Sequence, residues 1–332
     1  MEALITINNK LQQKEAAAGL LNYVMHHKCD MEIQVGWYEK LHNWDKALEL
    51  YQERLYVDDN NEEARLGQMR CLEALGEWNS LHSLVEENFD KLSVLKQARV
   101  GRLAAASAWG INNWGSMDKY IKVIPSETQD GAFYRAVLAI HNHQFDQAQN
   151  WINVTRDLLD TELTAMASES YERAYGAMVM VQMLAELEEV VQYKLVPERR
   201  QTICAMWWQR LQAGQRISED WQRIIQVHSL VLKPHEDMHT WLKYAALCRK
   251  SGSLKLSHKT LVMLLGSDPS ERPTHPLPIS QPQVTYAYAK YLWTCSDHQY
   301  AYNKLETFLS DYLRQPNSED VTQDERRRLL AR

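Results

Sequence analysis

Residues 37–55 read WYEKLHNWDKALELYQERL, and this stretch predicts a helix, a tight turn at His42–Asn43 and a second helix. Ala47 and Tyr51 lie four residues apart in the second helix, so a small and an aromatic side chain share one of its faces. A single helical hairpin cannot bury such a face by itself. The stretch therefore predicts neighbouring copies of the same unit.

Three further copies follow at nearly regular spacing. Their turns read LGEW (75–78), WGINNW (109–114) and IHNHQF (140–145), and an aromatic residue opens the second helix of each. The four aromatics are 34, 36 and 31 residues apart: Trp44, Trp78, Trp114 and Phe145. The positions three and seven residues later continue one apolar stripe, made of Ala47, Leu81, Met117, Ala148, Tyr51, Val85, Ile121 and Ile152.

This period and this small-then-aromatic spacing form the tetratricopeptide pattern. We predict an all-α fold, an α-α superhelix (solenoid) of tetratricopeptide-like hairpins, with the opening aromatics in its core. The helical pattern divides into tetratricopeptide-like repeats over 1–160, longer helical hairpins over 161–266, a Pro-rich loop over 267–283, a further hairpin over 284–313 and a tail over 314–332. Pro197 and Pro234 are expected where helices begin, and a turn is expected at Ser251–Gly252.

Composition narrows the protein class. The chain has 332 residues, only 12 Gly and 9 Pro, and no apolar run near the about 18 residues of a membrane span. The five cysteines have no paired spacing, which favours a reducing compartment over a disulfide framework or a zinc site. We expect a cytoplasmic protein that inserts into no membrane, and at a net charge of −6 we expect no nucleic-acid partner.

The motifs of several enzyme classes are missing. There is no Gly-rich phosphate loop, and the H-R-D and D-F-G motifs of protein kinases do not occur. His26, His27 and Cys29 form the only close group of soft metal ligands, and a helix would show them on different faces. We therefore predict no catalytic residues and no metal in this chain.

Six long strings carry a resemblance to a known family. They are RCLEALGEW (70–78), IPSETQDGAFYRAVLA (124–139), RDLLDTELTAMASESYERAYGAM (156–178), QYKLVPERR (192–200), HEDMHTWLKYA (235–245) and SQPQVTYAY (280–288). Together they closely resemble the FAT region of the target of rapamycin (TOR) family of serine/threonine protein kinases.

The resemblance implies a non-catalytic helical scaffold that clamps and regulates the kinase domain of the same polypeptide in nutrient and growth signalling. Its implied partners are that kinase domain and the subunits of a large TOR-type complex, which can be recruited to lysosomal or other endomembrane surfaces. The repeat pattern alone leaves an alternative open. A free-standing tetratricopeptide-like adaptor would bind extended peptides of partner proteins.

The resemblance also implies an inositol polyphosphate site, because Arg216, Lys243 and Lys250 match a basic pocket of the family. Residues 194–259 carry 12 basic and 5 acidic side chains, a local charge of +7, and Lys243 and Lys250 share one helix face. Inositol hexakisphosphate is thus the one expected ligand, as a structural rather than a catalytic group. The family carries a base near Thr294, which this chain lacks. The alternative is that the three are ordinary solvated side chains.

Overall fold

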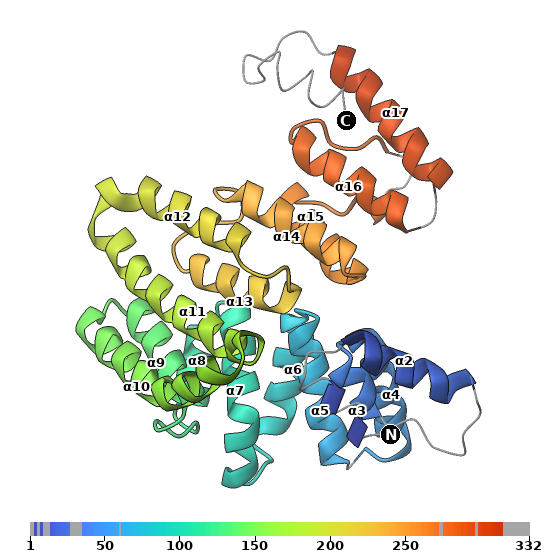
Figure 1. The fold of residues 1–332 in the computed structure, drawn as a ribbon. Helices are drawn as coiled ribbons and strands as arrows, with labels where there is room; N and C mark the ends of the chain where they lie inside the picture. Colours follow the sequence, from blue (N-terminus) through green and yellow to red (C-terminus); the bar gives the residue numbers. More distant parts are fainter. Residues whose placement is uncertain are drawn as a thin grey trace. The chain divides into compact units, whose positions relative to one another are not determined.

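The computed structural model describes residues 3–4, 7–8, 14–26, 35–59, 61–271, 275–295 and 298–314, and these residues form helices and no strands (Figure 1). The chain divides into two compact units, Met1–Gln215 with Glu219–Val231, and Arg216–Ser218 with Leu232–Arg332. The first unit contains α2 (Lys14–His26), α3 (Val35–Lys40), α4 (Trp44–Val57), α5 (Glu62–Ala74), α6 (Trp78–Phe89), α7 (Val94–Gly110), α8 (Trp114–Ile121), α9 (Gln129–His141), α10 (Phe145–Glu169), α11 (Tyr171–Leu195), the 3-10 helix η1 (Pro197–Arg199), α12 (Arg200–Ala213) and α13 (Ser218–His228).

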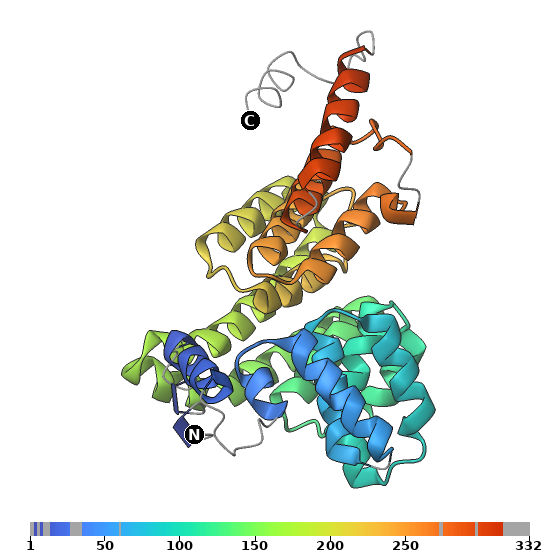
Figure 2. The same ribbon diagram turned by 90° about the vertical axis from the view of Figure 1, so that its right-hand side faces the viewer.

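The predicted hairpins are confirmed, and each opening aromatic is the first residue of its helix. Figure 2 shows the hairpins of the first unit following one another in sequence order. Each turn has one residue in the left-handed region two positions before the next helix: His42, Gly76, Asn112 and His143, with φ between 57° and 65°. In every turn the next residue donates its backbone N–H to a carbonyl five positions earlier, as Asn113 does to Ala108 at 2.8 Å. A shared turn geometry thus repeats the hairpin.

The predicted apolar stripe is buried along its whole length, from Ala47 and Tyr51 in α4 to Ala148 and Ile152 in α10. The expectation that the opening aromatics lie in the core is only partly correct. All four are half-buried: Trp44, Trp78, Trp114 and Phe145. Each stands beside a solvated turn, so its ring covers a neighbour instead of filling the core. An added Cβ on Gly110 would lie 2.5 Å from Cγ of Trp78, so Trp78 requires glycine there.

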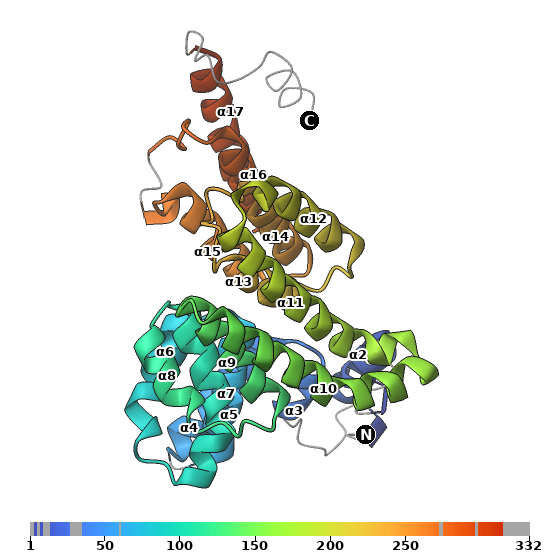
Figure 3. The ribbon, with the colours of Figure 1, turned by 90° about the vertical axis from the view of Figure 1, so that its left-hand side faces the viewer.

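The longer helices expected over 161–266 are found only in part, because the α-helices that follow residue 199 in this range have 11 to 14 residues. Helices α10 and α11 have 25 residues each and lie side by side in Figure 3. They are separated by Ser170 alone, whose backbone is extended at φ −160°. No Pro or Gly announces this break. The boundary expected at residue 160 falls inside α10.

The second unit contains α14 (Met238–Lys250), α15 (Leu254–Leu265), η2 (Pro269–Glu271), α16 (Pro282–Thr294) and α17 (His298–Arg314). The turn at Ser251–Gly252 is confirmed, with Gly252 at φ 89°. Pro197 begins η1 as expected, but Pro234 lies in a turn and α14 begins only at Met238. Leu277 of the Pro-rich segment is buried against α15 and α16, which holds that segment on the core. The tail 315–332 lies outside the described residues.

Candidate functional site

The three predicted polyanion ligands all lie in the second unit. Arg216 belongs to the short segment Arg216–Ser218, and Lys243 and Lys250 lie on α14. All three side chains are exposed. The opposite face of α14 is buried at Tyr244 and Cys248, as the spacing predicts, so the lysines face solvent about 10 Å apart along the helix axis.

Arg249 is a residue that sequence reasoning missed. Its Nη1 donates a hydrogen bond to Oγ1 of Thr294 at the end of α16, at 3.1 Å. A guanidinium from α14 therefore reaches Thr294, the position at which the resemblance leads us to expect a base. In the sequence, only its position next to Lys250 indicates that Arg249 could join the basic group. The residue spacing does not show that Arg249 packs near the end of α16.

The described residues contain no group of three or more side chains that could hold a metal ion. His27 and Cys29, of the group considered for a metal, lie outside the described part of the chain. None of the described helices is both long and apolar enough to span a bilayer.

A ladder of ion pairs joins successive hairpins of the first unit. Most pairs place the acid in one hairpin and the base in the next, 29 to 36 residues later: Glu39–Arg70, Glu62–Lys96, Glu63–Arg99, Glu73–Arg102, Asp90–Lys119 and, with the order reversed, Arg156–Glu188. Burial disfavours the charged form of Arg102, but Glu73 outweighs that effect and the pKa of Arg102 is raised. The two residues of each pair are separated by about one repeat length, so the ion pairs connect neighbouring hairpins.

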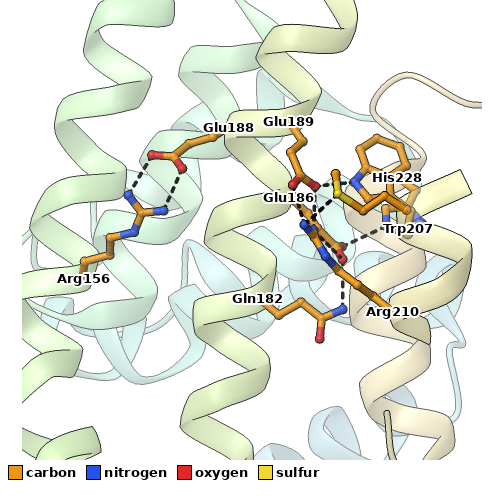
Figure 4. Close-up of polar contacts among 9 residues, drawn as sticks. Arg156, Gln182, Glu186, Glu188, Glu189, Trp207, Arg210 and His228 are labelled. Carbon is orange, nitrogen blue, oxygen red and sulfur yellow. Dashed lines mark hydrogen bonds and ion pairs between the residues drawn. The ribbon is translucent and has the colours of Figure 1, made fainter. Parts of the chain in front are cut away.

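The ladder continues into a buried polar network between α11, α12 and α13 (Figure 4). Glu189 accepts two hydrogen bonds from Arg210, both at 2.7 Å, and a third from Nε1 of Trp207 at 2.7 Å. Glu186 is fully buried and lies 2.8 Å from Nε2 of His228, whose ring stacks on Trp207 at 4.2 Å. Such satisfied networks fix one relative placement of the helices that share them.

Helix α13 also contacts the beginning of the unit. Nε1 of Trp44 donates to Oε1 of Glu219 at 3.0 Å, although 175 residues separate them, and Nδ1 of His42 lies 3.3 Å from the same oxygen. Burial would raise the pKa of Glu219, but the hydrogen bonds from His42 and Trp44 overcome it and lower that pKa to about 2. The first hairpin and α13 are therefore joined by a charged contact.

The chain is similar to one group of proteins over nearly its whole length. A family model for the FAT domain matches residues 101–330. Serine/threonine-protein kinase mTor of Drosophila melanogaster is 59% identical over 333 residues, which is 100% of this chain and 14% of that protein. Serine/threonine-protein kinase TOR2 of Saccharomyces cerevisiae is 40% identical over 93% of the chain, and TOR of Arabidopsis thaliana is 39% identical over 96%. The chain spans about one-seventh of the length of these relatives.

Proposed function

Because the chain belongs to the FAT-domain family, as the FAT region of a TOR-type serine/threonine protein kinase, we propose that it is a non-catalytic scaffold that braces and regulates the kinase domain of its own polypeptide. Subunits of a large TOR-type complex are its further partners, and the site of action is the cytoplasm, including endomembrane surfaces reached through those partners. Similarity to kinases along the whole chain favours this role over a free-standing peptide-binding adaptor.

The inter-hairpin ladder is the observation that carries the proposal. A brace must resist bending, and a solenoid is only as stiff as the contacts between neighbouring repeats. In the Arg156–Glu188 pair, two parallel hydrogen bonds of 2.7 Å fix α10 to α11 in one orientation. Ion pairs join α3 to α5, the α5–α6 hairpin to the α7–α8 hairpin, and α10 to α11, and they fix the orientation of helices that the apolar stripe holds together.

A charge swap in the full-length kinase tests the proposal. Arg156→Glu places two carboxylates together and should loosen α10 against α11, which changes the rate of peptide phosphorylation. Arg156→Glu with Glu188→Arg should restore that rate, because the pair re-forms with reversed polarity. Lys122→Glu is the control, because it breaks the exposed pair with Asp118 at an i, i+4 position, which joins no hairpins.

Hydrogen exchange separates the outcomes. The single variant should exchange faster along α10 and α11, and the swapped variant should not. If Arg156→Glu accelerates exchange but the full-length kinase phosphorylates its substrate at the wild-type rate, the region does not brace the kinase domain.

We propose further that Arg216, Lys243 and Lys250 bind inositol hexakisphosphate. All three are exposed cations of the second unit, and none has an ion-pair partner among the described residues. Arg249 supplies a fourth cation close to Thr294. A compact polyanion needs several fixed cations, since each charge-assisted contact contributes about 1.5 to 3 kcal/mol against the entropy lost on binding.

Calorimetry at near-physiological salt tests this site. We expect Lys243→Glu to abolish the binding of inositol hexakisphosphate, and Lys91→Glu, an exposed lysine of the first unit, to leave it unchanged. Saturating ligand should raise the melting temperature of the parent chain. If millimolar ligand gives no binding heat and leaves the melting temperature unchanged, the three residues do not form a binding site and are ordinary solvated side chains.

A further inference from the structure

The first unit contains a cavity of about 510 Å³ that the proposed function does not use. Its walls come from α4, α5, α6, α7, α9, α11 and α13. Ligand pockets in proteins are commonly about 300 to 1,000 Å³ and largely apolar, with a few polar groups that orient the ligand. This cavity has that size.

One part of the wall is apolar. Trp78, Trp109, Phe133, Met180 and Met183 line it, and the rings of Trp109 and Phe133 lie 6.1 Å apart. Flat aromatic faces and flexible thioethers accommodate an apolar body of varied shape. This wall selects for a hydrocarbon or aromatic group.

Most charges that line the cavity are already compensated. Arg70 is paired with Glu39, and Arg102 forms two hydrogen bonds with Glu73 at 2.6 and 2.7 Å. Asp130 also acts electrostatically on Arg102. Glu219 accepts the hydrogen bond from Trp44 described above. These charged side chains have partners within the protein and do not need a ligand to neutralise them.

Among the described residues, two side chains on α13 have donor groups with no hydrogen-bond or ion-pair partner. Arg223 lines the cavity and makes neither an ion pair nor a hydrogen bond there. Gln226, which also lines it, has a buried Nε2 atom with no hydrogen-bond partner. Three residues apart, they share one face of α13. A cation and an orphaned amide donor together favour an anionic acceptor group.

We propose that this cavity binds a compact ligand with an apolar body and a carboxylate, the carboxylate on Arg223 and Gln226 and the body against the aromatic and methionine wall. The Trp44–Glu219 contact joins α13 to the first hairpin at one edge of the cavity. That closure favours a small molecule over an extended peptide threaded along the repeats.

The test uses the 332-residue chain with 2-naphthylacetate as the probe and its uncharged amide as the matched ligand. Saturation-transfer NMR and calorimetry should show saturable binding of the carboxylate and weaker binding of the amide. Arg223→Gln should lower the affinity for 2-naphthylacetate by about tenfold or more, because one charge-assisted contact is lost. The same substitution should leave the affinity for the amide unchanged. Arg54→Gln removes an exposed arginine outside the cavity, and it should leave the affinities for both probes unchanged.

A variant that fills the cavity provides a second test, which does not depend on the charge of the ligand. Ala74 lines the cavity and is only partly buried, so Ala74→Trp can occupy the space without rebuilding the core. It should abolish binding of both probes while the melting curve stays cooperative. Equal affinity for the two probes, binding that survives Ala74→Trp, or binding of an extended acidic peptide in place of the small carboxylate would overturn the proposal.

Discussion

Replacing Glu219 with glutamine should weaken the contact between α13 and the first hairpin, and more so at neutral than at acid pH. Glutamine keeps the shape and one acceptor oxygen but cannot carry the charge that Trp44 and His42 stabilise. The substitution therefore measures the ionised state of Glu219, with little change in packing.

The size of the effect follows from the pKa. A fall from 4.5 in the unfolded chain to about 2 in the folded one corresponds to about 3 kcal/mol of stability at pH 7. The side chain is 28% exposed, so solvent screening makes this figure an upper bound. Because the folded pKa is the lower one, the contribution is full above pH 4.5 and is lost as the pH falls through about 2. At pH 3 about 1.4 kcal/mol remains.

Urea unfolding followed by circular dichroism at pH 7, 4 and 3 measures this difference. Glu219→Gln should be less stable than the parent by about 2 to 3 kcal/mol at pH 7, and the gap should narrow steadily with acid. In a double-mutant cycle with Trp44→Phe, which removes the Nε1 donor, the two losses should be less than additive. Glu62→Gln, at the exposed pair with Lys96, is the control and should cost less than about 1 kcal/mol.

Two results would refute this reasoning. Superimposable unfolding curves of parent and Glu219→Gln at pH 7 would show that the charge contributes nothing. A gap that stays constant from pH 7 to pH 3 would show that glutamine acts through packing and that the pKa of Glu219 is not lowered.

Three more substitutions test separate parts of the molecule. Thr294→Lys should tighten inositol hexakisphosphate binding in calorimetry by supplying the missing base, and unchanged affinity would place residue 294 outside the site. Gly110→Ala should destabilise the chain by about 1 to 3 kcal/mol in urea, because the new methyl group meets the Trp78 ring, and adding Trp78→Leu should recover part of that loss. Glu186→Ala should cost about 1 to 3 kcal/mol, since it leaves the buried His228 without its hydrogen-bond partner, and an unchanged free energy of unfolding would contradict the buried network.

The local structure could be predicted from the sequence because its causes lie within a few residues. The 3.6-residue period places Ala47 and Tyr51 on one face, and both are buried. The aromatic after each short turn marks a helix start, and α4, α6, α8 and α10 begin there. The lysines of α14 are exposed for the same reason, since their spacing sets them on the side of the helix away from the buried Tyr244 and Cys248.

The tertiary structure alone decided which distant residues meet. Small rotations from each hairpin to the next accumulate along the first unit, and their sum brings Trp44 to Glu219 across 175 residues. The packing of the first unit also leaves Trp78 half-buried over Gly110 and forms the cavity beside Arg223. Within the second unit, the packing of its own helices brings Arg249 to Thr294. Residue spacing encodes the face of a helix, but not the rotation between neighbouring hairpins, because that rotation is set by how whole side-chain surfaces pack.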